Sequence, residues 1–286
     1  MGAYPNHRSG RSARPDGERK ALMLRVAQVI KENASYLAEW VTREQGKPLG
    51  GVGPDQVPGS RFELWGCEVW TEVPASLDLP PEVVFEDETR RDEVHRKPLG
   101  VVGAIAPWNW PLLIAIWQII PSIRVGNTVV IKPSEYTSIG TLELVRLINE
   151  VLPPGVVNTV SGTGEVGAWL ANDSGIDKIM FTGSTATSVK IAEAAARNMI
   201  PTTMELGGND AAIVLPDADP KSMAMGLFWG AFINMGQTCA CTKASTMKPS
   251  PRSENWPRPC PWVTVLKRAW SWALSRTRCS PTKWSR

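Results

Sequence analysis

Residues 99–135 have the sequence LGVVGAIAPWNWPLLIAIWQIIPSIRVGNTVVIKPSE, and this stretch decides the fold. An apolar run is followed by a helical stretch at residues 112–123 and then by a second, β-branched run at residues 128–131. Short apolar strands that alternate with helices are typical of a parallel sheet whose two faces are covered by helices. The stretch therefore predicts an α/β fold.

The alternation continues along the chain. Strands are predicted at residues 99–106, 128–131, 156–160, 178–181 and 211–215. Helices are predicted between and after them, at residues 112–123, 139–151, 166–170, 187–197 and 221–234. Upstream, the pattern predicts a helix capped by Asp16, a helix over residues 36–44, a loop at 50–61 and a charged hairpin within 82–98.

Composition excludes several classes of protein. Hydrophobic residues make up 43% and charged residues 21% of the 286 residues, as in a soluble globular protein. No apolar run reaches the ~20 residues that span a bilayer, and residues 1–20 lack the apolar core of a secretory signal, so we expect no membrane association. Five cysteines without a regular spacing indicate free thiols in a reducing compartment, which predicts a cytoplasmic location.

Polar or glycine-rich motifs follow four of the predicted strands, at the end of a parallel strand where ligands bind. These motifs are residues 107–109, 132–135, 161–164 and 182–184. Residues 181–184 suit a pyrophosphate at a helix N-terminus, although an ordinary strand–helix turn is the alternative and no G-x-G-x-x-G is present. Lys132 and Glu135 suit ribose hydroxyls, with a solvated surface turn as the alternative.

Three further residues suit covalent chemistry on a carbonyl. Cys239 supplies a thiol and Glu205 a carboxylate, each in a setting of small residues. Asn109 lies between tryptophans and prolines, where a rigid amide suits an oxyanion donor or, alternatively, a cap for the helix that follows. Glu205 is the predicted general base, with an acid paired to a lysine as the alternative.

Histidine chemistry and metal chemistry are not expected. His7 and His95 are the only histidines, so neither a Ser-His-Asp nor a Cys-His mechanism has a convincing base. Cys239 and Cys241 are two residues apart, which is not the usual spacing of a zinc-ligand pair, and no histidine is nearby. We predict no metal site.

Taken in this order, the motifs resemble those of the NAD(P)-dependent aldehyde dehydrogenase superfamily, over about residues 16–243. Residues 44–48 and 96–102 also look like family sequence. The resemblance implies a Rossmann-like, parallel-sheet NAD-binding domain. Its predicted parts are a poorly matched segment at 1–15, the NAD-binding domain at 16–235 with an oligomerisation hairpin near 82–98, and the start of a catalytic domain at 236–243.

The resemblance also implies roles for individual residues. Cys239 would attack the aldehyde and form a thiohemiacetal, Asn109 and the Cys239 amide would hold the oxyanion, and Glu205 would activate water to hydrolyse the thioester. The cofactor-binding residues would be Ile105, Pro107, Trp108, Lys132, Ser134, Glu135, Gly164, Gly183, Ser184 and Leu206. Glu135 favours NAD, with NADP as the alternative, because a carboxylate repels a 2′-phosphate. Ser188 stands where the family usually has glycine, which predicts weaker cofactor binding.

Residues 244–286 are unlike the family. They hold nine Lys and Arg, one acid and five tryptophans, whereas the remaining 22 bases and 27 acids give the body a net charge of −5. A basic tail of this kind would suit a nucleic-acid arm. When the reading frame of its codons is shifted by one base, however, permitted codon choices give an amino-acid sequence similar to the one that follows the cysteine motif in the family. We therefore interpret the tail as a frameshift product near Lys243, expect it to be disordered, and expect no nucleic-acid partner.

The predicted function is oxidation of a small-molecule aldehyde to a carboxylic acid with NAD(P). With the catalytic domain largely missing, we expect this chain to show little or no turnover and at best weak NAD binding. A non-catalytic nucleotide-binding or interaction remnant of the fold is the alternative. An acyl-CoA-forming relative is disfavoured by Glu205. The family forms homo-oligomers, but the pairing partner of the hairpin is absent from this sequence.

Overall fold

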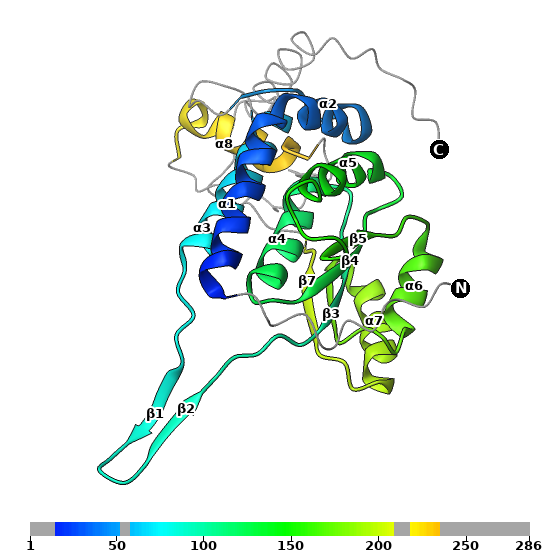
Figure 1. The fold of residues 1–286 in the computed structure, drawn as a ribbon. Helices are drawn as coiled ribbons and strands as arrows, with labels where there is room; N and C mark the ends of the chain where they lie inside the picture. The colour runs from blue at the N-terminus through cyan, green and yellow to red at the C-terminus, as the bar shows by residue number, and fades with distance from the viewer. Residues whose placement is uncertain (1–14, 52–57, 209–217, 235–286) are drawn as a thin grey trace, which may run out of the picture. The chain divides into compact units, whose positions relative to one another are not determined.

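The computed structural model describes residues 15–51, 58–208 and 218–234. The chain divides into two compact units, Met1–Gly207 and Gly208–Arg286, and each is described by itself. The first unit contains a five-stranded sheet, a two-stranded hairpin and helices α1 to α7 (Figure 1). The described part of the second unit contributes helix α8 (Pro220–Phe232).

The sheet is parallel throughout. Its strands are β3 (Val101–Ile105), β4 (Thr128–Lys132), β5 (Val157–Thr159), β6 (Lys178–Gly183) and β7 (Thr202–Leu206). They lie side by side in the order β5-β4-β3-β6-β7. Strands buried on both faces need apolar side chains on both, which explains the continuous apolar runs in the sequence. The predicted α/β fold is confirmed.

The two faces of the sheet bury separate cores. In β3, Val102 and Ala104 belong to one core and Ile105 to the other, because successive side chains of a strand point to opposite faces. The first core is covered by α4 (Pro111–Arg124) and α5 (Ser138–Ile148), and the second by α6 (Gly164–Asn172) and α7 (Thr185–Arg197). These helices lie where the sequence predicts them.

The strand order creates a topological switch beside β3. The chain runs outward from β3 to β4 and β5, and then continues on the other side of β3 with β6 and β7. The loop after β3 leads to α4 on one face, whereas the loop after β6 leads to α7 on the other. Open α/β sheets bind ligands at the carboxyl ends of the strands where such a reversal occurs.

Three N-terminal helices pack on α4 and α5. They are α1 (Asp16–Glu32), α2 (Ala34–Gln45) and α3 (Ser60–Ser76). Helix α3 is not predicted from the sequence, because its inward face includes polar Ser60, Glu63 and Thr71, which interrupt the apolar periodicity. The predicted loop at residues 50–61 ends at Gly59, where a Cβ would lie 2.1 Å from the Pro48 carbonyl oxygen.

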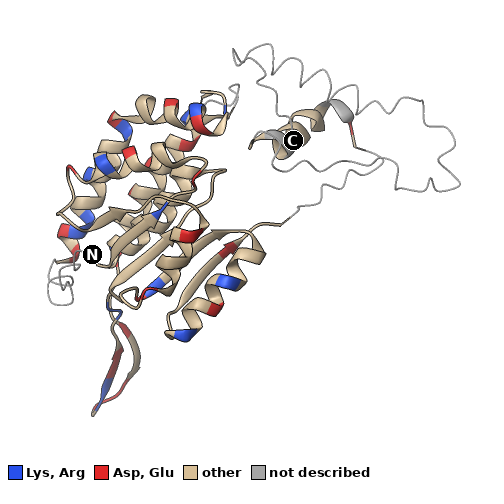
Figure 2. Ribbon diagram, turned by 90° about the vertical axis from the view of Figure 1, so that its right-hand side faces the viewer, with Lys and Arg blue, Asp and Glu red and all other residues tan. Residues whose placement is uncertain are grey.

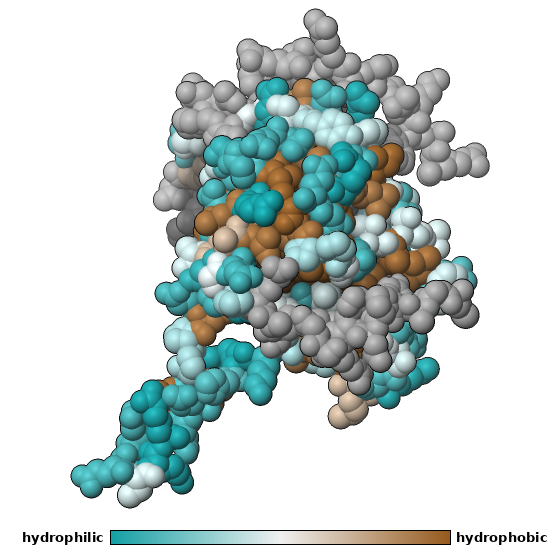
Figure 3. Space-filling view, in the orientation of Figure 1, coloured by the Kyte–Doolittle hydropathy of each residue, from teal (hydrophilic) through white to brown (hydrophobic). Residues whose placement is uncertain are grey.

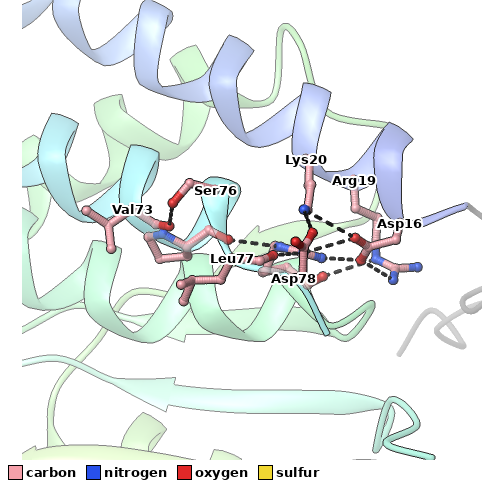
Figure 4. A network of polar contacts seen from close by, with 9 residues as sticks. Asp16, Arg19, Lys20, Val73, Ser76, Leu77 and Asp78 are labelled. Carbon is pink, nitrogen blue, oxygen red and sulfur yellow. Dashed lines mark hydrogen bonds and ion pairs between the residues drawn. The ribbon is translucent and has the colours of Figure 1, made fainter. Parts of the chain in front are cut away.

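The start of α1 differs from the prediction. Asp16 is the first helical residue rather than the cap, and Pro15 before it makes no side-chain capping bond. The Asp16 carboxylate instead accepts from Arg124 Nη1 at 2.5 Å and from Arg19 Nη2 at 2.9 Å, and Lys20 pairs with Asp78 nearby (Figure 4). This network joins the beginning of α1 to the ends of α3 and α4.

A charged hairpin projects from the sheet and helices of the first unit (Figure 1). It consists of antiparallel β1 (Glu82–Glu86) and β2 (Arg91–Val94), which confirms the predicted hairpin. The hairpin carries both acidic and basic residues (Figure 2), and they form the ion pairs Glu86–Arg91 at 3.0 Å and Glu82–Arg96 at 2.7 Å. Its surface is mainly hydrophilic in Figure 3.

One predicted strand and one observed strand have no counterpart within the described residues. The strand predicted at 211–215 lies outside the described residues. Strand β7 is not predicted from the sequence, because Thr202–Leu206 carries threonine and glutamate and is largely exposed, unlike the buried strands of the sheet.

Candidate active site

The carboxyl ends of the parallel strands bring the predicted site residues to one edge of the sheet. Ile105 at the end of β3 is paired with Lys132 at the end of β4 and with Phe181 in β6. Gly183 at the end of β6 is paired with Leu206 at the end of β7. The loops that carry the predicted motifs therefore begin at the same edge, as expected for parallel strands.

The loop after β4 combines a buried cation with an exposed carboxylate. The Lys132 side chain is 4% exposed, and its ammonium donates to the Pro133 carbonyl at 3.0 Å and lies 3.5 Å from the Glu135 carboxylate. Ser134 between them is buried. Gly167 of α6 packs on the lysine, since a Cβ there would lie 3.5 Å from Lys132 Cδ.

The backbone that leads from β3 into its loop is fixed on both sides. The Ile105 carbonyl accepts from Gln118 Nε2 of α4 at 3.2 Å, and the Ala106 N–H donates to the Lys132 carbonyl at 3.1 Å. Beyond these bonds, Pro107 is half-buried and the Trp108 side chain is 37% exposed. The β3 and β4 loops are thus tied together where they leave the sheet.

Asn109 is held through its backbone and its side chain. Its carbonyl accepts from Lys47 Nζ at 2.6 Å, and its Oδ1 accepts from the Trp110 N–H at 3.0 Å. The alternative that Asn109 caps the next helix is wrong, because the N-cap of α4 is Trp110 and no side-chain capping bond forms. With Oδ1 occupied, the NH₂ donors of the amide are left for other partners, and within the described residues no acceptor pairs with them.

A buried ion pair lies behind this loop. Lys47 and Glu63 are 2.9 Å apart, with side chains 1% and 0% exposed, and Lys47 Nζ lies 3.4 Å from the centroid of the Trp110 ring. Burial lowers the pKa of Lys47, and the carboxylate of Glu63 offsets part of that effect. Sequence reasoning missed this pair. The family-like motif at residues 44–48 contains Lys47, but nothing in it indicates a partner in α3.

The loop after β5 turns sharply into α6. Gly162 has φ +150°, and a Cβ there would lie 2.4 Å from Val166 Cγ2, so only glycine fits this turn. Gly164 is the first residue of α6, is exposed, and has no atom within 4 Å of the position a Cβ would take. The helix N-terminus is therefore open to a ligand.

The loop after β6 turns into α7 at Ser184. This serine caps α7, with Oγ accepting from the Thr187 N–H at 3.2 Å, and it is exposed. Gly183 before it lies tightly against Phe181, where a Cβ would come within 2.5 Å of the ring. Ser188 is buried, and its hydroxyl donates to the Thr185 carbonyl at 2.7 Å, so the extra oxygen is satisfied inside the helix.

The remaining catalytic predictions divide between described and undescribed residues. Glu205 lies in β7 opposite Thr182 and is exposed, and Leu206 after it is 44% exposed. Cys239 and Cys241 lie outside the described residues, as do the predicted segments 236–243 and 244–286. Cys67 is a free, buried cysteine, and burial raises the pKa of its thiol well above the ordinary range.

Within residues 15–51, 58–208 and 218–234, no group of three or more His, Cys, Asp and Glu residues is arranged to hold a metal ion. Within the same ranges, no helix has both the length and the apolar character needed to cross a membrane.

Comparison with known proteins agrees with this geometry. The sequence matches the family model described as "Aldehyde dehydrogenase family" over residues 7–250, which extends on both sides beyond the predicted 16–243. It is 38% identical over 261 residues to a chloroplastic aminoaldehyde dehydrogenase of Arabidopsis thaliana, covering 89% of this chain and 51% of that protein.

Solved structures give the same result. A putative aldehyde dehydrogenase from Burkholderia cenocepacia is similar with a TM-score of 0.73 and 40% sequence identity, covering 80% of this chain and 46% of that chain. PnpE of Pseudomonas sp. WBC-3, in complex with nicotinamide adenine dinucleotide, has a TM-score of 0.73 and 38% identity over 80% of this chain and 46% of its own. The chain spans about half the length of the relatives it matches. It belongs to the aldehyde dehydrogenase family.

Proposed function

We propose that the first unit binds NAD at the edge of its sheet where the parallel strands have their carboxyl ends. The bound NAD would be used in the oxidation of an aldehyde to a carboxylic acid. The observation that carries the proposal is the strand order, which places the motifs after β3, β4 and β6 at one edge and beside the topological switch. Family relatives support aldehyde oxidation in general, and three solved relatives contain NAD.

The residues at this edge have the chemistry that a dinucleotide needs. Ser184 and the exposed start of α7 offer backbone N–H donors for a pyrophosphate. Lys132 and Glu135 offer a donor and an acceptor for ribose hydroxyls. Gly162 permits the sharp turn into α6 that a side chain would block. The proposed cofactor site is completed by Ile105, Pro107, Trp108, Ser134, Gly164, Gly183 and Leu206.

The proposed chemistry assigns three roles. The Cys239 thiolate adds to the aldehyde carbon and forms a C–S bond, while the Asn109 amide donates to the resulting oxyanion. When bound, NAD supplies the hydride acceptor that converts this adduct to a thioester. Glu205 then takes a proton from water, whose oxygen attacks the thioester carbon. The C–S bond breaks, releasing the acid and the thiolate.

Cofactor binding is tested by calorimetry with NAD on the purified chain. Lys132→Met removes a charge-assisted donor and should weaken binding about tenfold or more. Lys178→Met is the matched control, because Lys178 begins β6 at the opposite edge of the sheet. Equal effects of the two variants, or no binding by the unmodified chain, would contradict the proposed site.

The choice between NAD and NADP depends on Glu135. Its exposed carboxylate would repel a 2′-phosphate, although Lys132 at 3.5 Å reduces that repulsion. We expect Glu135→Gln to raise the affinity for NADP relative to NAD. An unchanged ratio of the two dissociation constants would show that this carboxylate does not face the adenosine ribose.

Catalysis is tested separately by aldehyde-dependent NADH formation. Loss of the signal in Cys239→Ala would support the thiol as nucleophile. The alternative, a nucleotide-binding remnant without catalysis, predicts that NAD binding survives and that Cys239→Ala changes nothing. The same assay measures whether residues 1–286 show little or no turnover, as the sequence leads us to expect.

A further inference from the structure

The start of α4 is capped from a distance by a carboxylate. Glu63 of α3 accepts from the Leu112 N–H at 2.9 Å and from the Leu113 N–H at 3.2 Å, in the first turn of α4. These N–H groups have no partner within the helix, and an anion at a helix N-terminus is favourable. Glu63 alone therefore satisfies the start of α4, and Lys47 is not needed for capping.

A second helix of the same unit shows the simpler arrangement. Glu44 of α2 accepts from the Ile139 N–H at 2.7 Å and from the Gly140 N–H at 2.8 Å, at the start of α5. Within the described part of the chain, no lysine or arginine pairs with Glu44. The first N–H groups of α4 and of α5 thus both donate to a glutamate from another helix. Of these two glutamates, only Glu63, at the helix that follows Asn109, is paired with a buried lysine.

Lys47 contacts Glu63 and the loop that carries Asn109. Lys47 Nζ donates to Glu63 Oε2 at 2.9 Å and to the Asn109 carbonyl at 2.6 Å, and it lies 3.4 Å from the Trp110 ring centroid. A buried ion pair is weak evidence of a stabilising role, because well-packed apolar residues of similar volume often serve stability as well or better. The role of the Lys47–Glu63 pair is therefore better explained by the groups that it holds in place, namely the Asn109 carbonyl and the first turn of α4.

We propose that Lys47 and Glu63 are positioning residues that hold Asn109 for its oxyanion role, an inference that rests on the proposed function. Lys47 fixes the Asn109 carbonyl, Glu63 fixes the first turn of α4, and the Trp110 N–H fixes Asn109 Oδ1. The backbone on both sides of the amide is thereby anchored. Oxyanion donors act because they are held in place before the charge develops.

The test compares two variants of the full chain. Lys47→Met/Glu63→Gln removes both charges at similar volume and keeps an acceptor for the α4 N–H groups. Arg124→Met is the matched control, because it removes a buried charge from the other end of α4, and none of the Arg124 bonds reaches residues 109–113. We expect the first variant to lower kcat about 10- to 100-fold with an unchanged KM for NAD, and the control to keep its kcat.

A third variant separates positioning from a general structural role. Asn109→Ala should lower kcat by at least as much, and adding Lys47→Met/Glu63→Gln to it should lower kcat no further, because both changes act through one amide. An unchanged kcat in Lys47→Met/Glu63→Gln, or fully additive losses in the combined variant, would overturn the inference.

Amide hydrogen exchange makes the outcome independent of turnover. The N–H groups of Trp110, Leu112 and Leu113 should exchange faster in Lys47→Met/Glu63→Gln and at the unmodified rate in Arg124→Met. If the unmodified chain forms no NADH, the catalytic part of the proposed function fails for this chain, while faster exchange confined to the first variant still supports the positioning role. Equal exchange in both variants would overturn it.

Discussion

The two ends of α4 are both anchored by charged side chains, yet the anchors differ in burial. At the N-terminal end, Lys47 and Glu63 are 1% and 0% exposed and hold the loop that carries Asn109. At the C-terminal end, Arg124 is 4% exposed but its partner Asp16 is 40% exposed. The end next to the candidate site thus has fully dehydrated charges, and the distant end keeps one charge in contact with water.

The largest effect is expected from Lys47→Met. It leaves the Glu63 carboxylate buried without its counter-ion, which should cost about 3–5 kcal/mol of unfolding free energy. Chemical denaturation measures this loss, and Lys47→Met/Glu63→Gln is the control that should recover most of it. A loss below about 1 kcal/mol would mean that water reaches Glu63 and that the two ends of α4 do not differ in this respect.

A smaller loss is expected from Arg124→Met at the other end. Arg124 donates to the carbonyls of Pro74 at 3.0 Å and Leu77 at 2.6 Å and to the Asp16 carboxylate. Losing these bonds should cost about 2 kcal/mol, since Asp16 can be hydrated once it is released. Denaturation under the same conditions gives the comparison, and a loss as large as that of Lys47→Met would remove the distinction between the two ends.

The pH dependence should separate the ends further. The hydrogen bond from Arg124 holds the pKa of Asp16 below its ordinary value of 3.8. Because the folded-state pKa is the lower one, the stabilisation is fully present above pH 3.8 and is lost as the pH falls through the folded-state value.

We expect Asp16→Asn to be less stable than the unmodified chain above that window, by under about 1 kcal/mol because solvent screens a half-exposed carboxylate. The difference should disappear as the pH falls through the window. Unfolding free energies of both proteins over this pH range provide the measurement. A difference that does not change with pH would exclude Asp16 as the titrating group.

The smallest effect on stability is expected at an exposed ion pair, which serves as the reference for the buried pairs. Lys31 and Glu68 form an ion pair at 2.6 Å, with the Lys31 side chain 60% exposed. The Glu68 hydrogen bond raises the pKa of Lys31, but the lysine end of the pair is in contact with solvent. We expect Lys31→Ala to leave the denaturation midpoint unchanged. A clear shift would show that burial does not rank these ion pairs.

Much of the sheet region is predictable from local pattern. The strands at the centre of the sheet are apolar on both faces, so β3 and β4 are evident as short runs bounded by motifs and helices. Strand β7 and helix α3 are missed for one reason. Both carry polar residues where the pattern requires apolar ones, and in α3 these include Glu63, which is buried because it has partners elsewhere in the chain.

The candidate site is predictable in part. The sequence places Asn109, Lys132 and Ser184 at or just after the ends of strands, and the structure has those strand ends at one edge of the sheet, while their roles stay predictions. The Lys47–Glu63 pair is not found, because its members are 16 residues apart and meet only when the segment after α2 packs against α3. The roles of Cys239 and Glu205 stay predictions.

By itself, the sequence determined the alternation of strands and helices and the order of the site motifs. Those features depend on side-chain periodicity and turn chemistry over a few residues. Only the tertiary structure decided that β6 lies beside β3, so that the loops after them share an edge, and that Lys47 reaches Asn109. These outcomes depend on contacts between distant segments, and many pairings of the same elements satisfy the same local pattern.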